Sequence, residues 1–112
     1  MKIISWNEFE QVELRVGTIV SAEPFPEARK PAWKLVVDFG DEIGHKKSSA
    51  QLTDLYRAEE LVGRQVVAVV NFQPKQIGPM VSEVLVTGFH NANGAVALCV
   101  PDKPVPNGAK LL

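Results

Sequence analysis

Apolar and polar residues alternate from residue 12 to residue 23, and this alternation constrains the fold more than any other feature of the chain. The apolar positions are Val12, Leu14, Val16, Val20 and Ala22, and the polar positions between them are Glu13, Arg15, Ser21 and Glu23. A period of two predicts a half-buried β-strand. The strand is long, so we expect Gly17 to mark a bulge or bend where it turns around the corner of a barrel.

Several further segments also have the patterns of strands. They cover residues 33–39, 45–52, 66–70, 84–86 and 95–100. The first of them alternates, the second is unusually polar, and the third is continuously apolar, as is typical of a central strand. Asn93-Gly94 is a strong hairpin signal, and it predicts that the last two segments form a hairpin.

Two short helices are predicted from capping signals. Ser5 and Glu8 have the spacing of a capping box at the start of the chain. Thr53 or Asp54 can cap a helix over residues 55–62, which Gly63 would end. A helix between the third and fourth strands is typical of the five-stranded Greek-key OB (oligonucleotide/oligosaccharide-binding) barrel, whereas an SH3-like barrel would lack it.

The size and composition fit one folded domain. The chain has 112 residues, of which 46% are hydrophobic, so we expect an all-β OB barrel over residues 1–112 with short terminal extensions. Twelve basic and thirteen acidic residues give a net charge of -1, which argues mildly against nucleic-acid binding but leaves room for a local basic stripe. No stretch resembles a signal peptide or a membrane span, so we expect a cytoplasmic protein without membrane insertion.

No catalytic or metal-binding pattern is visible. His45 and His90 are the only histidines, and neither has a partner at metal-ligand spacing. The single cysteine, Cys99, lies in an apolar run, where we expect a buried and inert thiol. We therefore predict a binding protein rather than an enzyme, with no metal and no cofactor.

A polar and basic set of residues is predicted to share one face of the barrel. Its members are Arg15, Lys34, Lys46, Lys47, Ser48, Ser49 and Gln51 on the first three strands, with Asn71 and Lys75 at the start of the loop after the fourth. OB folds hold oligonucleotides on strands two and three and the flanking loops. Cations would meet phosphate, while hydroxyl and amide groups would donate and accept hydrogen bonds. A merely solvated strand face fits these residues equally well.

A second set is apolar and lies outside the regular strands. Its members are Trp6, Phe9, Ile77, Met80, Val105, Leu111 and Leu112. A contiguous apolar patch marks an interface. Covering the barrel ends within one chain is an equally good explanation at this point.

Four short segments in order resemble the tRNA-binding domain shared by some methionyl-tRNA synthetase C-termini and free-standing tRNA-binding proteins. They are Leu14–Val20, Pro26–Ala28, Leu61–Arg64 and Val69–Pro74. Within that family, residues 25–35 and 46–52 are similar to the CsaA branch, which is described as an export-related chaperone.

The resemblance implies an OB fold and a homodimer formed through the terminal extensions, with Trp6, Phe9, Val105, Leu111 and Leu112 at the interface. It implies binding of unfolded or precursor polypeptides for export, with tRNA as a further ligand; the alternative is a tRNA-binding accessory protein that recognises tRNA shape. The positions that match the family's groove are Arg15, Ser48, Ser49, Gln51, Asn71 and Ser82. The basic residue expected beside Gly78 is missing and Glu83 adds a negative charge, which favours the polypeptide.

Overall fold

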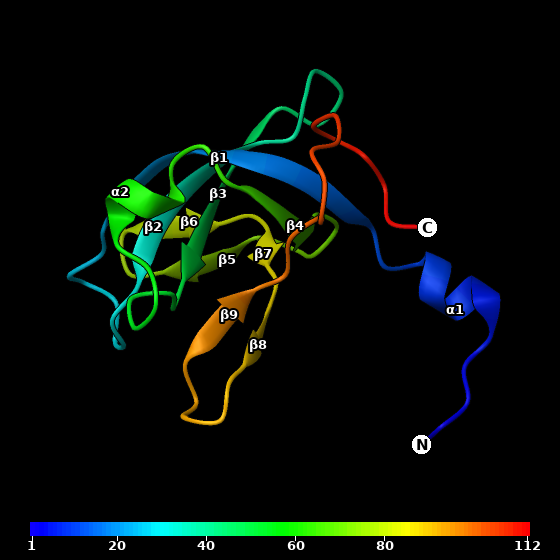
Figure 1. Cartoon of the computed structure of the whole chain (residues 1–112), viewed down its shortest axis with the longest axis horizontal. Coiled ribbons are helices and arrows are strands. Elements are labelled where there is room, and N and C mark those ends of the chain that lie inside the picture. The colour runs from blue at the N-terminus through cyan, green and yellow to red at the C-terminus, as the bar shows by residue number, and fades with distance from the viewer.

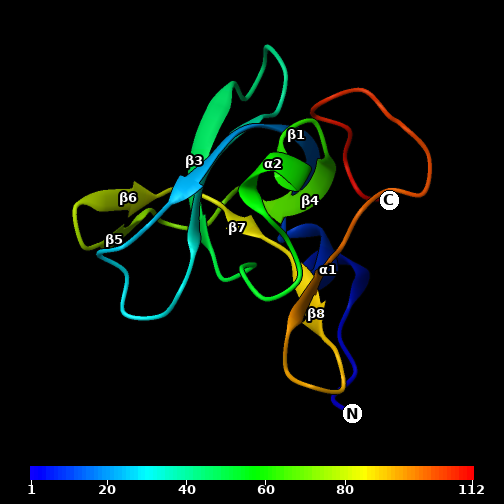
Figure 2. The same cartoon turned by 60° about the vertical axis from the view of Figure 1, so that its left-hand side comes forward.

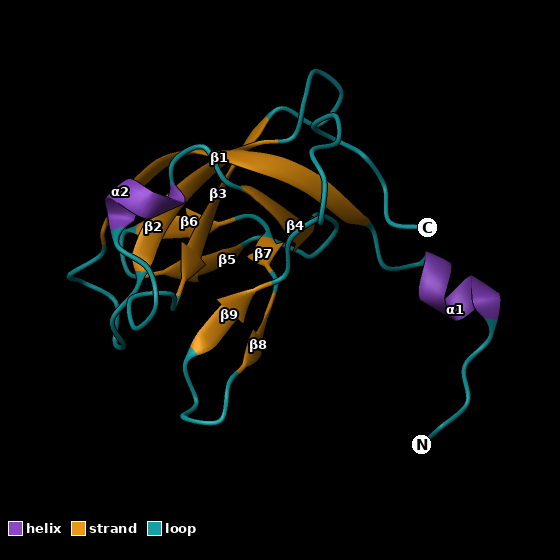
Figure 3. Ribbon diagram, in the orientation of Figure 1, coloured by secondary structure: helices purple, strands orange, loops and turns teal.

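Five antiparallel strands form the central sheet of the computed structural model, which describes residues 1–112 (Figures 1 and 3). The elements in order are α1 (Trp6–Glu10), β1 (Leu14–Pro24), β2 (Trp33–Asp38), β3 (His45–Ala50), α2 (Ala58–Leu61), β4 (Gln65–Val69), β5 (Lys75–Ile77), β6 (Met80–Ser82), β7 (Leu85–Val86), β8 (Gly88–His90) and β9 (Val96–Leu98). The sheet order is β3-β2-β1-β4-β7, and β5–β6 and β8–β9 form separate two-stranded hairpins.

The sheet curls until β3 approaches the connection between β6 and β7. The Glu83 amide donates to the Lys47 carbonyl at 2.8 Å, and the Lys47 amide donates to the Glu83 carboxylate at 3.0 Å. The Ser49 amide donates to the Ser82 hydroxyl at 3.2 Å. These bonds nearly close a five-stranded barrel, and α2 lies between β3 and β4, so the predicted OB-type fold is confirmed.

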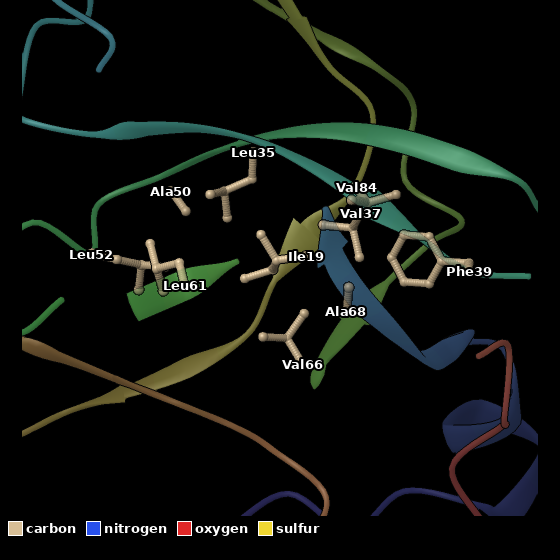
Figure 4. Close-up of a cluster of buried hydrophobic side chains, with 10 residues drawn as sticks. All are labelled: Ile19, Leu35, Val37, Phe39, Ala50, Leu52, Leu61, Val66, Ala68 and Val84. Atoms are coloured by element: carbon tan, nitrogen blue, oxygen red, sulfur yellow. The ribbon is translucent and has the colours of Figure 1, made fainter. Parts of the chain in front are cut away.

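Aliphatic side chains and one aromatic ring fill the barrel (Figure 4). The cluster consists of Ile19, Leu35, Val37, Phe39, Ala50, Leu52, Leu61, Val66, Ala68 and Val84. Ile19, Leu35 and Val37 are completely buried, and the short helix α2 contributes the completely buried Leu61. The removal of this apolar surface from water is the main force that stabilises the barrel.

The bulge in β1 lies beyond the glycine where we expected it. The pairing register between β1 and β2 shifts between Ile19 and Ser21, while Gly17 stays in regular register opposite Val66 on β4. An extra residue at this point reverses which side chains face inward. Ile19 is therefore fully buried and Val20 is 41% exposed, so the prediction that Val20 lies on the buried face is wrong.

Of the two predicted helices, only the first begins where the sequence predicts. Ser5 and Glu8 form the predicted capping box, with hydrogen bonds of 2.9 and 3.1 Å. The second helix begins at Ala58 rather than at residue 55, because Tyr56 is held in the preceding loop, where its carbonyl accepts the Trp33 indole N–H at 3.0 Å. Neither helix has the length and apolar character of a membrane-spanning helix.

Arg57, not Thr53 or Asp54, is the cap residue of this second helix, which corrects the prediction. The Arg57 amide donates to the Glu60 carboxylate at 2.8 Å, and this bond lowers the pKa of Glu60.

The strands near the C-terminus pair differently from the sequence prediction. Asn93-Gly94 does lie in a hairpin turn, where Gly94 has a φ of +83°. However, β9 pairs with β8 and not with residues 84–86, because β7 is held by β4 in the main sheet. Cys99 follows β9 and is half-buried rather than buried.

The C-terminal segment lies along the N-terminal half of β1. Backbone hydrogen bonds join Val16 to Gly108 and Ala109, and the Leu111 amide donates to the Leu14 carbonyl. The Asn107 side chain accepts a hydrogen bond from the Thr18 hydroxyl at 2.8 Å. The segment therefore completes the edge of β1 that β2 leaves unpaired, since β2 pairs only with residues 18–24.

Candidate functional site

Two neighbouring hollows form a groove beside β3 and the β5–β6 hairpin. The first has a volume of about 440 Å³ and is lined by Ser49, Phe72, Gln73, Lys75, Ile77, Ser82, Glu83, Val84 and Leu85. The second has a volume of about 820 Å³ and is lined by Glu27, Ala28, Arg29, Lys30, Ala32, Ser49, Gln51, Lys75, Gln76, Ile77 and Gly78. We call them the apolar hollow and the basic hollow. They share Ser49, Lys75 and Ile77, so they form one continuous groove.

The groove concentrates positive charge that is not paired with a carboxylate. Arg29, Lys30 and Lys75 line it directly. Lys34 is paired in register with Ser49, so both side chains lie on the outer face of the sheet, and the neighbouring Lys47 is exposed there. None of these five cations has an ion-pair partner within 4.0 Å, because all such pairs involve other residues. A protein with a net charge of -1 thus has a locally basic groove.

Four of the predicted ligand-binding residues line this groove, namely Ser49, Gln51, Lys75 and Ser82. Lys34 and Lys47 lie beside it on the same outer face of the sheet. Lys46 and Ser48 point the other way, because they are paired with the buried residues Val37 and Leu35, and Ser48 is only 1% exposed. The expectation that all the polar residues of β3 share one face is therefore wrong, since side chains alternate along a strand.

Arg15 and Asn71 do not line the groove. Arg15 joins the start of β1 to the C-terminal segment, and Asn71 joins the loop after β4 to the N-terminal segment. The Arg15 guanidinium contacts the Glu13 carboxylate at 2.7 Å and donates to the Gly108 carbonyl at 2.9 Å. The hydrogen bond from Arg15, helped by the charge of Lys110, holds the pKa of Glu13 below its usual value. The Asn71 amide donates to the Gln11 carbonyl at 2.7 Å and accepts from the Glu13 backbone N–H at 3.0 Å.

The groove residues that the sequence prediction missed include Arg29, Lys30 and Phe72. Arg29 and Lys30 lie in the proline-rich loop between β1 and β2, a loop that OB folds use for ligands, so their position was an available signal. Phe72 is 56% exposed, although it follows a continuously apolar strand and would be expected to be buried. Nothing in the local sequence pattern marks its exposure.

The predicted interface residues gather on a different surface. One hollow of about 300 Å³ is lined by Trp6, Phe9, Leu111 and Leu112, among others, and the two aromatic ring centroids are 6.1 Å apart. A neighbouring hollow of about 390 Å³ shares Leu111 and Leu112 and includes Val105. We call this region the terminal surface. The C-terminus and the β5–β6 hairpin lie on opposite sides of the barrel (Figures 1 and 2).

The remaining two residues of the apolar set lie elsewhere. Ile77 lines the groove. Met80 is buried with Phe25 and Ala32 beneath the basic hollow, whose lining includes Ala32.

The groove offers cations, hydroxyls, amides and apolar side chains, together with the carboxylates of Glu27 and Glu83, and such groups can hold a ligand by charge, hydrogen bonds and apolar contact. The structure contains no cluster of three or more His, Cys, Asp or Glu side chains that could hold a metal ion. His45 lies 3.7 Å from Asp38, and His90 contacts the Gly94 carbonyl at 3.0 Å. A five-stranded barrel with such a groove beside strands two and three defines an OB-type binding domain.

The comparison with known proteins agrees with this class. The chain belongs to the family described as "Putative tRNA binding domain", whose pattern matches residues 14–110. Methionine–tRNA ligase from Methanocaldococcus jannaschii is 32% identical over 111 residues, which are 99% of this chain and 17% of that enzyme. The chain thus spans less than a fifth of that synthetase.

Two solved structures match over nearly their full length. The chaperone CsaA from Bacillus anthracis is 47% identical with a TM-score of 0.92, and the match covers 99% of this chain and 100% of that one. The CsaA chaperone protein from Picrophilus torridus is also 47% identical, with a TM-score of 0.91 and coverage of 98% and 100%. The predicted resemblance to the CsaA branch of the tRNA-binding-domain family is confirmed.

Proposed function

We propose that this chain is a non-catalytic chaperone that binds unfolded or precursor polypeptides in the groove before their export. The observation that carries this proposal is the near-complete match, at 47% identity, to two chaperones named CsaA. The apolar hollow supports it, because Phe72 and Leu85 are 56% and 49% exposed there. An unfolded chain offers apolar side chains for such a surface and unpaired backbone groups for Ser49, Gln51 and Ser82.

A second candidate ligand is tRNA. The unpaired cations of the groove favour it, because they can neutralise phosphates without first breaking an ion pair. Membership of a tRNA-binding family supports the same ligand. The proposed contacts are Arg29, Lys30, Lys34, Lys47 and Lys75 for phosphate, and Ser49, Gln51 and Ser82 for hydrogen bonds.

We further propose that the protein acts in the cytoplasm as a two-fold symmetric homodimer formed through the terminal surface. Trp6 is 73% exposed and Leu111 is 47% exposed, which leaves a large apolar area in water in a single copy. Burying the same patch on both copies satisfies the symmetry of a dimer. The β5–β6 hairpin, which lines the groove, lies on the opposite side of the barrel from the C-terminus (Figures 1 and 2), so the groove would stay open in such a dimer.

One titration series separates the two ligands. A labelled denatured protein and bulk tRNA are each titrated against the chain at low and high salt. Polypeptide held by apolar contact should bind at both salt concentrations, whereas tRNA binding should weaken steeply with salt. If only tRNA binds, and salt abolishes this binding, the chaperone proposal is wrong.

Replacing Lys47 and Lys75 together with alanine should reduce the steepness of the salt dependence of tRNA binding. The log-log slope should fall by about two, because each cation neutralises roughly one phosphate. The matched control replaces Lys2 and Lys103, which carry the same charge but lie in the terminal segments, away from β3 and the groove. An equal slope in the groove variant and the control would rule out these phosphate contacts.

A further inference from the structure

Phe72 is an exposed aromatic ring with no aromatic partner in the chain. Its side chain lines the apolar hollow beside Lys75 and Ile77 and is 56% exposed. The only aromatic pair in the structure is Trp6 with Phe9, and the two cation–ring contacts involve the rings of Phe25 and Tyr56. The face of the Phe72 ring is therefore available to a ligand.

The free cations continue away from this ring along the groove. Lys75 lines both hollows, and Arg29 and Lys30 line the second. A third hollow of about 210 Å³ shares Lys30 and Gln51 with the basic hollow and extends to His90 at the β8–β9 hairpin. One path thus runs from the aromatic ring past three cations to the far end of the barrel face.

We propose that this path binds an unpaired stretch of RNA, with one base stacked on Phe72 and the following phosphates on Lys75, Arg29 and Lys30. A basic groove with an aromatic platform is the combination that holds single strands in OB folds. Bases inside a duplex are already stacked on their neighbours, so a ring on a protein surface reaches only unpaired bases. Stacking needs no particular base, so the site selects strandedness more than sequence. This inference rests on the second candidate in the proposed function, namely that the groove binds tRNA.

The test uses a labelled RNA strand of about 12 nucleotides, within the site size of one OB fold. The same strand is measured in three forms: single, annealed to its complement, and with abasic sites in place of the bases. We expect the single strand to bind most tightly to the wild-type chain. Phe72→Ala should weaken it by about 5- to 150-fold, the usual contribution of one stacked base. The salt dependence should stay unchanged, because no cation has been removed.

Two conservative variants separate stacking from apolar contact. Phe72→Tyr keeps the aromatic face and should bind the single strand within about twofold of wild type. Phe72→Leu keeps an apolar side chain without that face and should behave like the alanine variant. The abasic strand should bind all four proteins equally, which checks that the variants leave the cations in place.

The results that would contradict the stacking site can be told apart from those that would contradict tRNA binding. If tRNA binds but the single strand binds no better than its duplex, the inference fails and the tRNA proposal stands. If no RNA binds at all, both fail. If Phe72→Leu keeps full affinity for RNA, or if Phe72→Ala weakens only a denatured polypeptide, the ring is an apolar contact and the stacking site is wrong.

Discussion

Replacing Gly17 with valine should lower the free energy of unfolding by roughly 1–3 kcal/mol, the usual effect of overpacking a core. A Cβ atom added at this position would lie 2.6 Å from Val37 Cγ1 and 2.7 Å from Phe39 Cδ1. Real carbon–carbon contacts have an optimum near 3.5–4.0 Å, so these side chains would have to move. They cannot move outward, because Val37 and Phe39 are 0% and 1% exposed in the middle of the barrel.

Urea unfolding of the two proteins measures this effect. The control is Val20→Ala on the same strand, where the side chain is 41% exposed, and its effect should be within about 0.5 kcal/mol. Unchanged stability of Gly17→Val would contradict the packing described for β1 and β2.

Replacing Trp6 with alanine should raise the dissociation constant of the homodimer by about 30-fold or more. Buried aromatic residues are the usual hot spots of an interface, with effects of about 2 kcal/mol and above. Trp6 sits with Phe9, Leu111 and Leu112 around the hollow of the terminal surface. Sedimentation of the intact protein and the variant over a range of concentrations gives both constants.

The matched control for this experiment is Phe89→Ala. Phe89 is 70% exposed, similar to Trp6, but it lies on the β8–β9 hairpin, away from the terminal surface. A monomeric intact protein at micromolar concentration, or equal effects of the two variants, would contradict the proposed interface. Deleting residues 104–112 is a poorer test, because it would also remove the hydrogen bonds of Asn107 and Ala109 to β1 and β4.

Local patterns in the sequence predicted most of the barrel, because they reflect short-range physics. Neighbouring residues set the alternation over residues 12–23, the capping box at Ser5 and the turn at Asn93-Gly94. The bulge at Val20 depends instead on how two strands pair across the barrel, which a local pattern does not reveal. The later start of α2 likewise depends on the distant Trp33, which binds the Tyr56 carbonyl.

The sequence predicted which kinds of residue form the candidate site better than it predicted where those residues lie in the structure. The alternation of β3 could have separated Ser48 from Ser49, since neighbours on a strand face opposite sides. Arg15 looked like a groove cation, but its partners Glu13 and Gly108 are contributed by the strand start and by a segment 93 residues away. Such long-range pairing also explains why the role of Asn107 in the C-terminal segment was not predicted.

Backbone NMR spectra of the isotope-labelled chain, recorded during addition of a denatured polypeptide and separately of tRNA, test most directly whether the groove is the ligand site. If the groove is the ligand site, we expect the amide signals of Ser49, Gln51, Lys75 and Ser82 to shift or broaden with a ligand that binds, while those of α1 and residues 105–112 stay unchanged. Changes confined to the terminal surface or to the β8–β9 hairpin, with a silent groove, would contradict it.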